Sequence, residues 1–302
     1  MHPSAISWRR STVAGLLIAA AGLVAGSAFA AAPDLSTPEG QLQAMRRIQC
    51  SKIDGKPVTF YWKGVMYSRV PGEPDRLLFN VEGMNVRQCG PLADAGNGGF
   101  RLVSREILLY EDPATGEVLR TWNNPWTGKT VNVIQVANDP VNGNYGMVGR
   151  DGKPLKPFIT TMGDHWWVSL TVPLFYPNPL GGDYQQYVGG TYHATEFFNF
   201  FGSVKDLLNP KADTADLAVG WERISSWLPW MEMGDRPGIV YFQTAGRKLE
   251  KWDDISSTMK AEIDKNYPAW RNPPPLDDQR RNETSWTYFK KIIDSQKAGA
   301  AK

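Results

Sequence analysis

The sequence contains few of the side chains that usually carry metal or thiol chemistry. It has 3 histidines and 2 cysteines among 302 residues, and only His165 and His193 lie beyond residue 30. Two histidines cannot form a three-histidine zinc site. The G-x-S-x-G, G-x-x-x-x-G-K-[ST], H-E-x-x-H and paired C-x-x-C motifs are all missing. We therefore predict neither a metal site nor another cofactor.

Acidic residues are missing from the first 30 positions, which have the order of an export signal. Arg9 and Arg10 precede an uncharged apolar run at 13–24, and Ala28 and Ala30 provide an A-x-A cleavage site. The run is well short of the roughly 20 apolar residues that a membrane-spanning helix needs. The adjacent arginines favour the twin-arginine route. We predict a cleaved signal peptide and a periplasmic or secreted protein that is not inserted in a membrane. An uncleaved N-terminal anchor is the alternative.

Without that signal the chain also lacks net charge. The sequence has 33 Lys+Arg and 31 Asp+Glu, and residues 1–30 contribute two arginines and no acid, which leaves 31 residues of each sign. A neutral protein gains no general attraction to nucleic acid, an anionic membrane or a polyanion. We therefore predict no nucleic-acid partner. The remaining length can bury a substantial core, and we interpret residues 31–302 as one domain.

The two cysteines, Cys50 and Cys89, both lie in the part that would be exported. In an oxidising compartment an even pair is a candidate disulfide. It would close a loop of about 40 residues and stabilise the fold by roughly 3 to 4 kcal/mol in the chain-entropy model. Two buried thiols are the alternative.

Long helical patterns are scarce, whereas turn residues are abundant. The 29 glycines and 22 prolines occur at almost every apparent turn, which indicates many short strands. Lys63-Gly64, between two β-branched and aromatic runs, is typical of a hairpin turn, and so is Gly163-Asp164. Strands are expected at 58–62, 65–70, 77–84, 100–110, 118–122, 130–137, 156–162, 165–172, 217–224 and 239–244.

Sequential hairpins without alternating helices favour an antiparallel sheet. We predict a mainly β fold, an up-and-down, lipocalin-like barrel of about ten strands, because closure removes exposed sheet edges. A two-sheet sandwich is the alternative. A few peripheral helices are expected: one after Thr37, one at 253–263 and one at 286–293. Residues 192–208 fit either an amphipathic helix or a strand followed by a helix.

His193 and Glu196 form the best local pair of titratable groups. If 192–208 is helical, their i, i+3 spacing places both side chains on one face, where they could act as a base and its partner. If the segment is a strand, they point to opposite faces. A structural, hydrogen-bonded histidine is the alternative.

Residues 221–238 have an unusual composition, with three tryptophans, two methionines and five charged residues. Large flat side chains beside fixed charges suit an apolar pocket with a few polar anchors. Trp227 and Trp230, together with Trp62 from the first predicted strand, are the expected aromatic contacts of a ligand. An aromatic corner of the core is the competing interpretation.

Charged residues of the same segment could supply the chemistry. Arg223 and Arg236 could clamp a carboxylate through paired hydrogen bonds. Glu222, Glu232 or Asp235, if buried, could have a raised pKa and act as an acid or base. An Arg–Asp ion pair that closes the aromatic corner is the alternative.

Seven segments share a pattern that covers nearly all of the chain beyond residue 30: Pro71-Gly72-Glu73, Glu82-Gly83-Met84-Asn85, Trp122-Asn123-Asn124-Pro125 with Thr127-Gly128, Asn138-Asp139-Pro140-Val141-Asn142, Tyr176-Pro177-Asn178-Pro179-Leu180, the 227–238 block and Thr284-Ser285-Trp286-Thr287-Tyr288-Phe289. The pattern resembles a bacterial and fungal family known as domain of unknown function 1838. The resemblance implies one continuous domain and frequent export, and it assigns no catalytic residues. Cys50 and Cys89 are not part of the pattern.

Two functions of different classes are consistent with these residues. The first is an exported protein whose barrel binds an apolar or aromatic small molecule. The second is a cofactor-independent lyase, isomerase or hydrolase that acts on such a molecule with His193, Glu232 or Asp235 as acid–base groups. An enzyme requires an acid inside the cavity next to vacant space, whereas the acids of a pure binder are paired with arginine or solvated.

Overall fold

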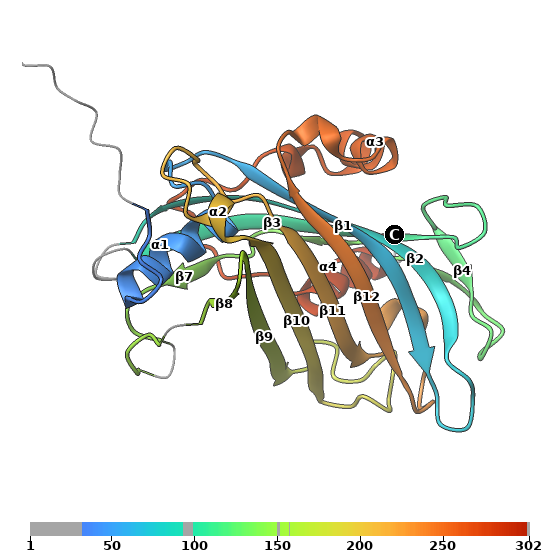
Figure 1. Cartoon of the computed structure of the whole chain (residues 1–302). Helices are drawn as coiled ribbons and strands as arrows, with labels where there is room; N and C mark the ends of the chain where they lie inside the picture. The colour runs from blue at the N-terminus through green and yellow to red at the C-terminus, as the bar shows by residue number, and fades with distance from the viewer. Residues whose placement is uncertain (1–31, 93–98, 150–151, 157, 301–302) are drawn as a thin grey trace, which may run out of the picture. The chain divides into compact units, whose positions relative to one another are not determined.

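The computed structural model describes residues 32–92, 99–149, 152–156 and 158–300, so the predicted signal peptide lies outside the described residues. The main feature is a ten-stranded antiparallel sheet in the order β6-β3-β2-β1-β12-β11-β10-β9-β8, with β7 paired to β3 (Figure 1). Its strands are β1 (Val58–Arg69), β2 (Arg76–Pro91), β3 (Phe100–Glu111), β6 (Val136–Asn138), β7 (Gly143–Tyr145), β8 (Thr160–Met162), β9 (His165–Pro177), β10 (Thr191–Ser203), β11 (Ala218–Ser226) and β12 (Ile239–Leu249). A separate hairpin pairs β4 (Thr121–Asn123) with β5 (Thr130–Asn132).

The mainly β, up-and-down antiparallel fold is confirmed, but the predicted closure of the barrel is wrong. The first and last long strands, β1 and β12, pair over eleven residue positions, as they would in a barrel. The sheet instead ends at β6 and β8, each only three residues long. The chain between β3 and β9 is dominated by turn residues and forms short strands, so it supplies no long strand to bridge these edges. One curved, open sheet results, which also excludes the two-sheet sandwich.

The hairpin expected at Lys63-Gly64 is wrong, because β1 runs through these residues without interruption. Gly64 is required for close packing rather than for a turn. A Cβ atom at Gly64 would overlap the Gln243 carbonyl oxygen on β12, and one at Gly246 would overlap that of Tyr61 on β1. The two glycines therefore let β1 and β12 approach each other.

Two helices cover different parts of the sheet. The predicted N-terminal helix is α1 (Pro38–Gln49), and the Thr37 hydroxyl caps it by accepting a hydrogen bond from the Gly40 N–H at 3.1 Å. Its C-terminal end is joined to β2 by the Cys50–Cys89 disulfide. Helix α3 (Ser257–Asn266) packs Met259 and Ile263 against one face of β2 and β3, here called the outer face.

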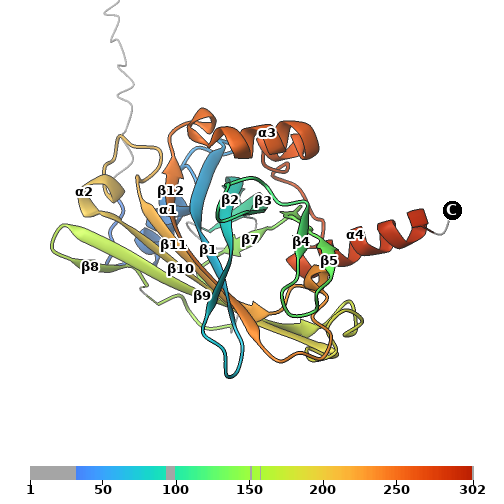
Figure 2. The same ribbon diagram turned by 90° about the vertical axis from the view of Figure 1, so that its right-hand side faces the viewer.

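Helix α4 (Ser285–Ala300) and the residues before it pass along the other, inner face of the sheet (Figure 2). The Glu283 N–H donates to the Pro140 carbonyl at 2.9 Å, next to β6. The buried Trp286 ring lies 4.2 Å from that of Tyr192 on β10, between centroids. The start of α4 therefore contacts strands from both halves of the open sheet.

The remaining helical segments are short: α2 (Val204–Leu207), which follows β10, and the 3-10 turns Pro229–Met231, Trp252–Asp254 and Pro268–Arg271. No helix in the described part of the chain is both long and apolar enough to cross a membrane.

Candidate functional site

A cavity of about 380 Å³ lies against the inner face of the sheet. Its walls are alternate residues of β1, β2, β3, β9, β10 and β11, because successive side chains of a strand point to opposite faces. Small-molecule sites commonly enclose roughly 300 to 1,000 Å³ and are mostly apolar. The cavity matches that description, since its lining includes Phe60, Trp62, Leu170, Val172, Phe198 and Trp221.

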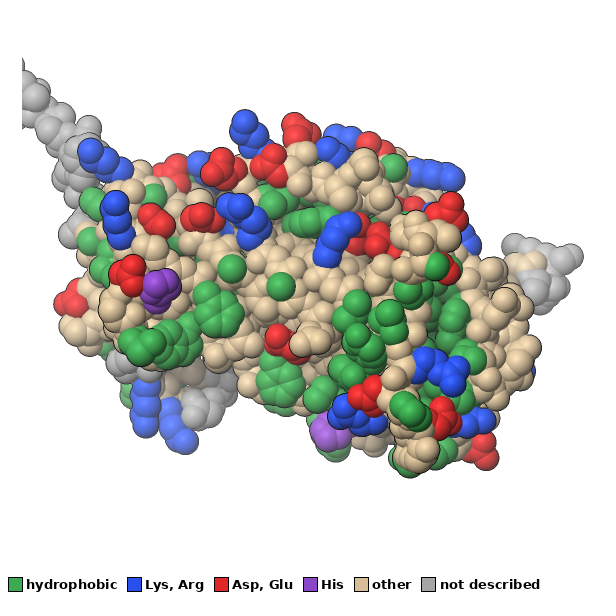
Figure 3. All heavy atoms as spheres, turned by 45° about the vertical axis from the view of Figure 1, so that its right-hand side comes forward, with side chains coloured by type: hydrophobic (Ala, Val, Ile, Leu, Met, Phe, Trp, Pro, Cys, Tyr) green, Lys and Arg blue, Asp and Glu red, His purple; other side chains and the backbone are tan. Residues whose placement is uncertain are grey.

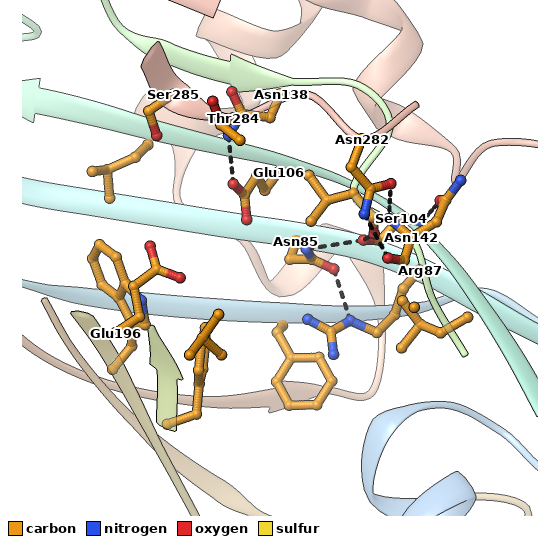
Figure 4. Close-up of a pocket in the computed structure, with 18 of the residues that line it drawn as sticks. Asn85, Arg87, Ser104, Glu106, Asn138, Asn142, Glu196, Asn282, Thr284 and Ser285 are labelled. Carbon is orange, nitrogen blue, oxygen red and sulfur yellow. Dashed lines mark hydrogen bonds between the residues drawn. The ribbon is translucent and has the colours of Figure 1, made fainter. Parts of the chain in front are cut away.

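Polar side chains interrupt this apolar lining at a few places. Asn85 and Arg87 project from β2, Ser104 and Glu106 from β3, and Glu196 from β10 (Figure 4). Asn85 and Ser104 are buried, whereas Arg87, Glu106 and Glu196 are half-buried. Burying polar groups is costly unless they are paired, so their partners indicate what the cavity can do.

Glu106 is an acid inside the cavity without a cationic partner among the described residues. Its Oε1 accepts a hydrogen bond from Asn138 Nδ2 at 2.6 Å. Burial raises the pKa of Glu106, and the Asn138 hydrogen bond and the charges of Arg223 and Arg87 offset only part of this. A carboxyl group with a raised pKa can hold a proton near neutral pH and donate it.

Glu196 lines the same cavity as Glu106 (Figure 4). It forms an ion pair with Arg223. Arg223 Nη1 donates to Glu196 Oε1 at 3.2 Å and to Ser285 Oγ at 3.3 Å, and Nη2 donates to the Tyr192 hydroxyl. Burial raises the pKa of Glu196 to about 7, since it outweighs the attraction of Arg223. Burial also lowers the pKa of Arg223, but Tyr192 and Glu196 more than offset it, so the guanidinium stays charged.

Glu196→Gln is expected to flatten the pH dependence of stability. The unfolded chain ionises this carboxyl near its ordinary pKa of 4.5, and the folded protein only near 7. Between these values the unfolded state holds fewer protons, so the free energy of unfolding falls by about 3 kcal/mol as the pH rises. Urea unfolding from pH 4 to 8 measures this slope.

The control for this prediction is Glu117→Gln, which removes the same charge from an exposed turn and should retain the wild-type slope. Glu111 contributes to the pH dependence of stability in wild type and in both variants, because burial and Glu82 raise its pKa to about 7 as well. A Glu196→Gln slope equal to that of wild type would show that Glu196 ionises normally.

The comparisons with known proteins concern the family rather than an activity. The family model described as "Protein of unknown function (DUF1838)" matches residues 55–293. The chain belongs to the DUF1838 family. The predicted resemblance is thus confirmed, and the matched range contains all strands of the sheet and the start of α4. None of the curated proteins matches the chain.

In this DUF1838 protein, two of the residues predicted as ligand contacts, Trp62 and Arg223, line the cavity. The other two tryptophans lie in a separate aromatic cluster. The Trp230 ring is 5.3 Å from that of Tyr110, and the Trp227 ring is 5.1 Å from that of Trp126, between centroids. Both are buried and belong to the core.

The predicted acid–base groups also lie outside the cavity. Glu232 forms an ion pair of 3.3 Å with Lys129, and Asp235 is exposed. His193 is exposed beside Phe175. The helical pairing of His193 with Glu196 is wrong, because β10 places these two side chains on opposite faces.

Arg236, the other predicted carboxylate clamp, is likewise engaged away from the cavity. Its Nη1 lies 3.9 Å from Glu73, and its Nη2 donates to the Trp126 carbonyl at 3.4 Å. The region around residues 227–236 therefore stabilises a corner of the fold in the structure, whereas Arg223 belongs to the cavity.

Sequence reasoning missed Arg87 and Glu106. The sequence does contain a local pattern there, since Asn85 and Arg87 alternate with the buried Met84 and Val86 along β2. Such alternation usually marks a solvated face. The fold shows that α3 covers the face of this strand that carries Met84 and Val86, and that Asn85 and Arg87 face the cavity on the other side.

The described residues contain no group of three or more His, Cys, Asp or Glu side chains that could hold a metal ion. The cavity groups that can do chemistry are thus carboxyls, guanidinium groups, amides and hydroxyls.

Proposed function

We propose that this protein is exported and that its cavity binds an apolar or aromatic small molecule. The observation that carries the proposal is a cavity of about 380 Å³ with a mostly apolar surface, aromatic side chains in its walls and several polar groups that could anchor a ligand. Export is supported by the signal-like order of residues 1–30 and by the disulfide, since disulfides persist in oxidising compartments. Basic and acidic side chains are interspersed on the face drawn in Figure 3, which supports a small-molecule ligand over a polyanion.

Filling the cavity is expected to abolish binding. N-phenyl-1-naphthylamine, a neutral aromatic dye whose fluorescence rises in apolar surroundings, serves as the probe. Val172→Trp places a large ring into the cavity. It should lower the affinity for the dye about tenfold or more, because the ring occupies the space that the dye needs. Fluorescence titration of the chain without its signal measures the affinity.

The control is Thr171→Trp, which adds the same ring on the same strand but on the exposed face. It should bind the dye like wild type. Equal affinity in the two variants, or no binding by wild type, would contradict a ligand-binding cavity.

Glu106 favours acid–base catalysis as a second candidate function. Its carboxyl lies in the cavity without a paired cation among the described residues, which an enzyme needs and a pure binder does not. Protonated Glu106 would donate a proton to the bound molecule, and Glu196 would accept or return one near pH 7. The decisive comparison is the fate of a ligand isolated with the protein: wild type would convert it and Glu106→Gln would leave it intact, whereas an unchanged ligand in both supports binding alone.

A further inference from the structure

Arg87, at one end of the cavity, is charged but has only neutral partners among the described residues. Its Nε donates to Asn85 Oδ1 at 2.7 Å, and its Nη1 donates to Gln49 Oε1. Its guanidinium carbon lies 4.4 Å from the centre of the Phe60 ring. A guanidinium group has five N–H donors, so these two hydrogen bonds leave several donors for another acceptor.

The two cations that line the cavity differ in this respect. Arg223 is balanced by Glu196. Arg87 has no carboxylate at ion-pair distance in the described part of the chain, and burial lowers its pKa to about 10, which still leaves it charged at neutral pH. Buried charges are normally paired. The acid that acts on Arg87 through its charge is Glu106, whose raised pKa favours the neutral form.

Lys248, which lies near the same Phe60 ring, is a buried basic group whose donors all have acceptors, and burial and the charge of Arg87 lower its pKa well below the ordinary value. Its Nζ donates to the Arg47 and Ile48 carbonyls at 2.6 and 2.9 Å and to the Thr214 hydroxyl at 2.5 Å. These three acceptors leave Nζ without an unused donor. Arg87, by contrast, keeps unused donors next to the empty space of the cavity.

We propose that Arg87 binds the negative group of the ligand, so that the ligand is an apolar or aromatic molecule with a single oxyanion such as a carboxylate. This inference rests on the proposed binding function and names its ligand class. The planar guanidinium can hold two oxygens of one such group, while Trp62, Phe198 and Trp221 contact the apolar part. One unpaired guanidinium balances one negative charge, which favours a monoanion.

Two dyes with the same aromatic frame test this inference. 8-Anilinonaphthalene-1-sulfonate carries one sulfonate, and N-phenyl-1-naphthylamine lacks it. Wild type is expected to bind the anionic dye about 10- to 100-fold more tightly, the usual range for a hydrogen bond to a charged group. Arg87→Gln should lose this preference and keep its affinity for the neutral dye. Arg87→Lys, which retains the charge but not the planar fork, should retain part of the preference.

Arg69→Gln is the matched control, since Arg69 also lies over an aromatic ring, Tyr241 at 5.0 Å, but on the exposed surface beside Asp75. It should retain the preference for the anionic dye. If wild type binds the neutral dye at least as tightly as the anionic one, the role of Arg87 is overturned while the cavity remains a binding site. If neither dye binds, the proposed function fails, and this inference fails with it. The wild-type comparison decides the matter even if Arg87→Gln does not fold.

Discussion

Replacing Trp286 with alanine is expected to lower the free energy of unfolding by roughly 3 to 5 kcal/mol, the range for removing a large aromatic side chain from a core. Trp286 is fully buried and packs against Tyr192 on β10. Its indole Nε1 has no hydrogen-bond partner among the described residues. The loss of stability therefore comes almost entirely from lost packing contacts, because alanine is too small to fill the space of the indole ring.

The same substitution should also weaken binding in the cavity. Trp286 follows Ser285, whose hydroxyl accepts a hydrogen bond from Arg223, and residues 282–285 line the cavity. Without Trp286, the start of α4 loses its contact with Tyr192 on β10, which is one of the contacts that hold this wall in place. Urea unfolding and titration with N-phenyl-1-naphthylamine measure the two effects on the same sample.

Phe175→Ala is the control for Trp286→Ala, because Phe175 is a large aromatic residue of the neighbouring strand β9 that is 73% exposed. Its removal should change stability by no more than about 0.5 kcal/mol. A loss below about 1 kcal/mol for Trp286→Ala would show that α4 is not a structural wall of the site.

The strands were predictable wherever alternation and turn chemistry agreed. Gly163-Asp164 forms the turn between β8 and β9, as expected. Lys63-Gly64 has the same turn-like composition but lies inside β1. Its glycine lets β12, about 180 residues further along the chain, pack closely against β1. The edge strands β6 and β8 lie close together in the chain and are three residues each, so whether these edges meet depends on how the turn-rich segment between them packs, which strand alternation does not indicate.

The site was less predictable than the fold, and the reason is physical. The tryptophan-rich segment at 221–238 drew attention because its composition is unusual, yet Trp227 and Trp230 are core residues. Arg87 and Glu106 are polar residues in ordinary strands, and they are half-buried because they face the cavity. The surroundings of a charged side chain are known only from the folded structure, so the sequence indicated an apolar pocket with aromatic side chains and a few polar anchors but, apart from Arg223, not the charged residues that line it.

Removing the disulfide is expected to cost about 4 kcal/mol of folding free energy in the chain-entropy model, since the bond links residues 39 positions apart. A Cys50→Ala and Cys89→Ala double variant, compared with wild type in urea, measures this loss. Both sulfurs are fully buried, so alanine avoids placing new polar groups there. Wild type treated with reductant in denaturant should refold to the stability of the variant; no change on reduction would contradict the prediction.

The disulfide should also control ligand selectivity, because it joins the two segments that position Arg87. Gln49, which accepts a hydrogen bond from Arg87, immediately precedes Cys50, and Arg87 lies two residues before Cys89. Opening the bond frees the end of α1 from β2, so the preference for the anionic dye should fall while the neutral dye still binds to the folded variant. The intact mass of purified wild type checks the starting material, since it reports whether residues 1–30 and the two thiol hydrogens are lost. A variant with unchanged selectivity would show that Asn85 and Phe60 alone hold Arg87 in place.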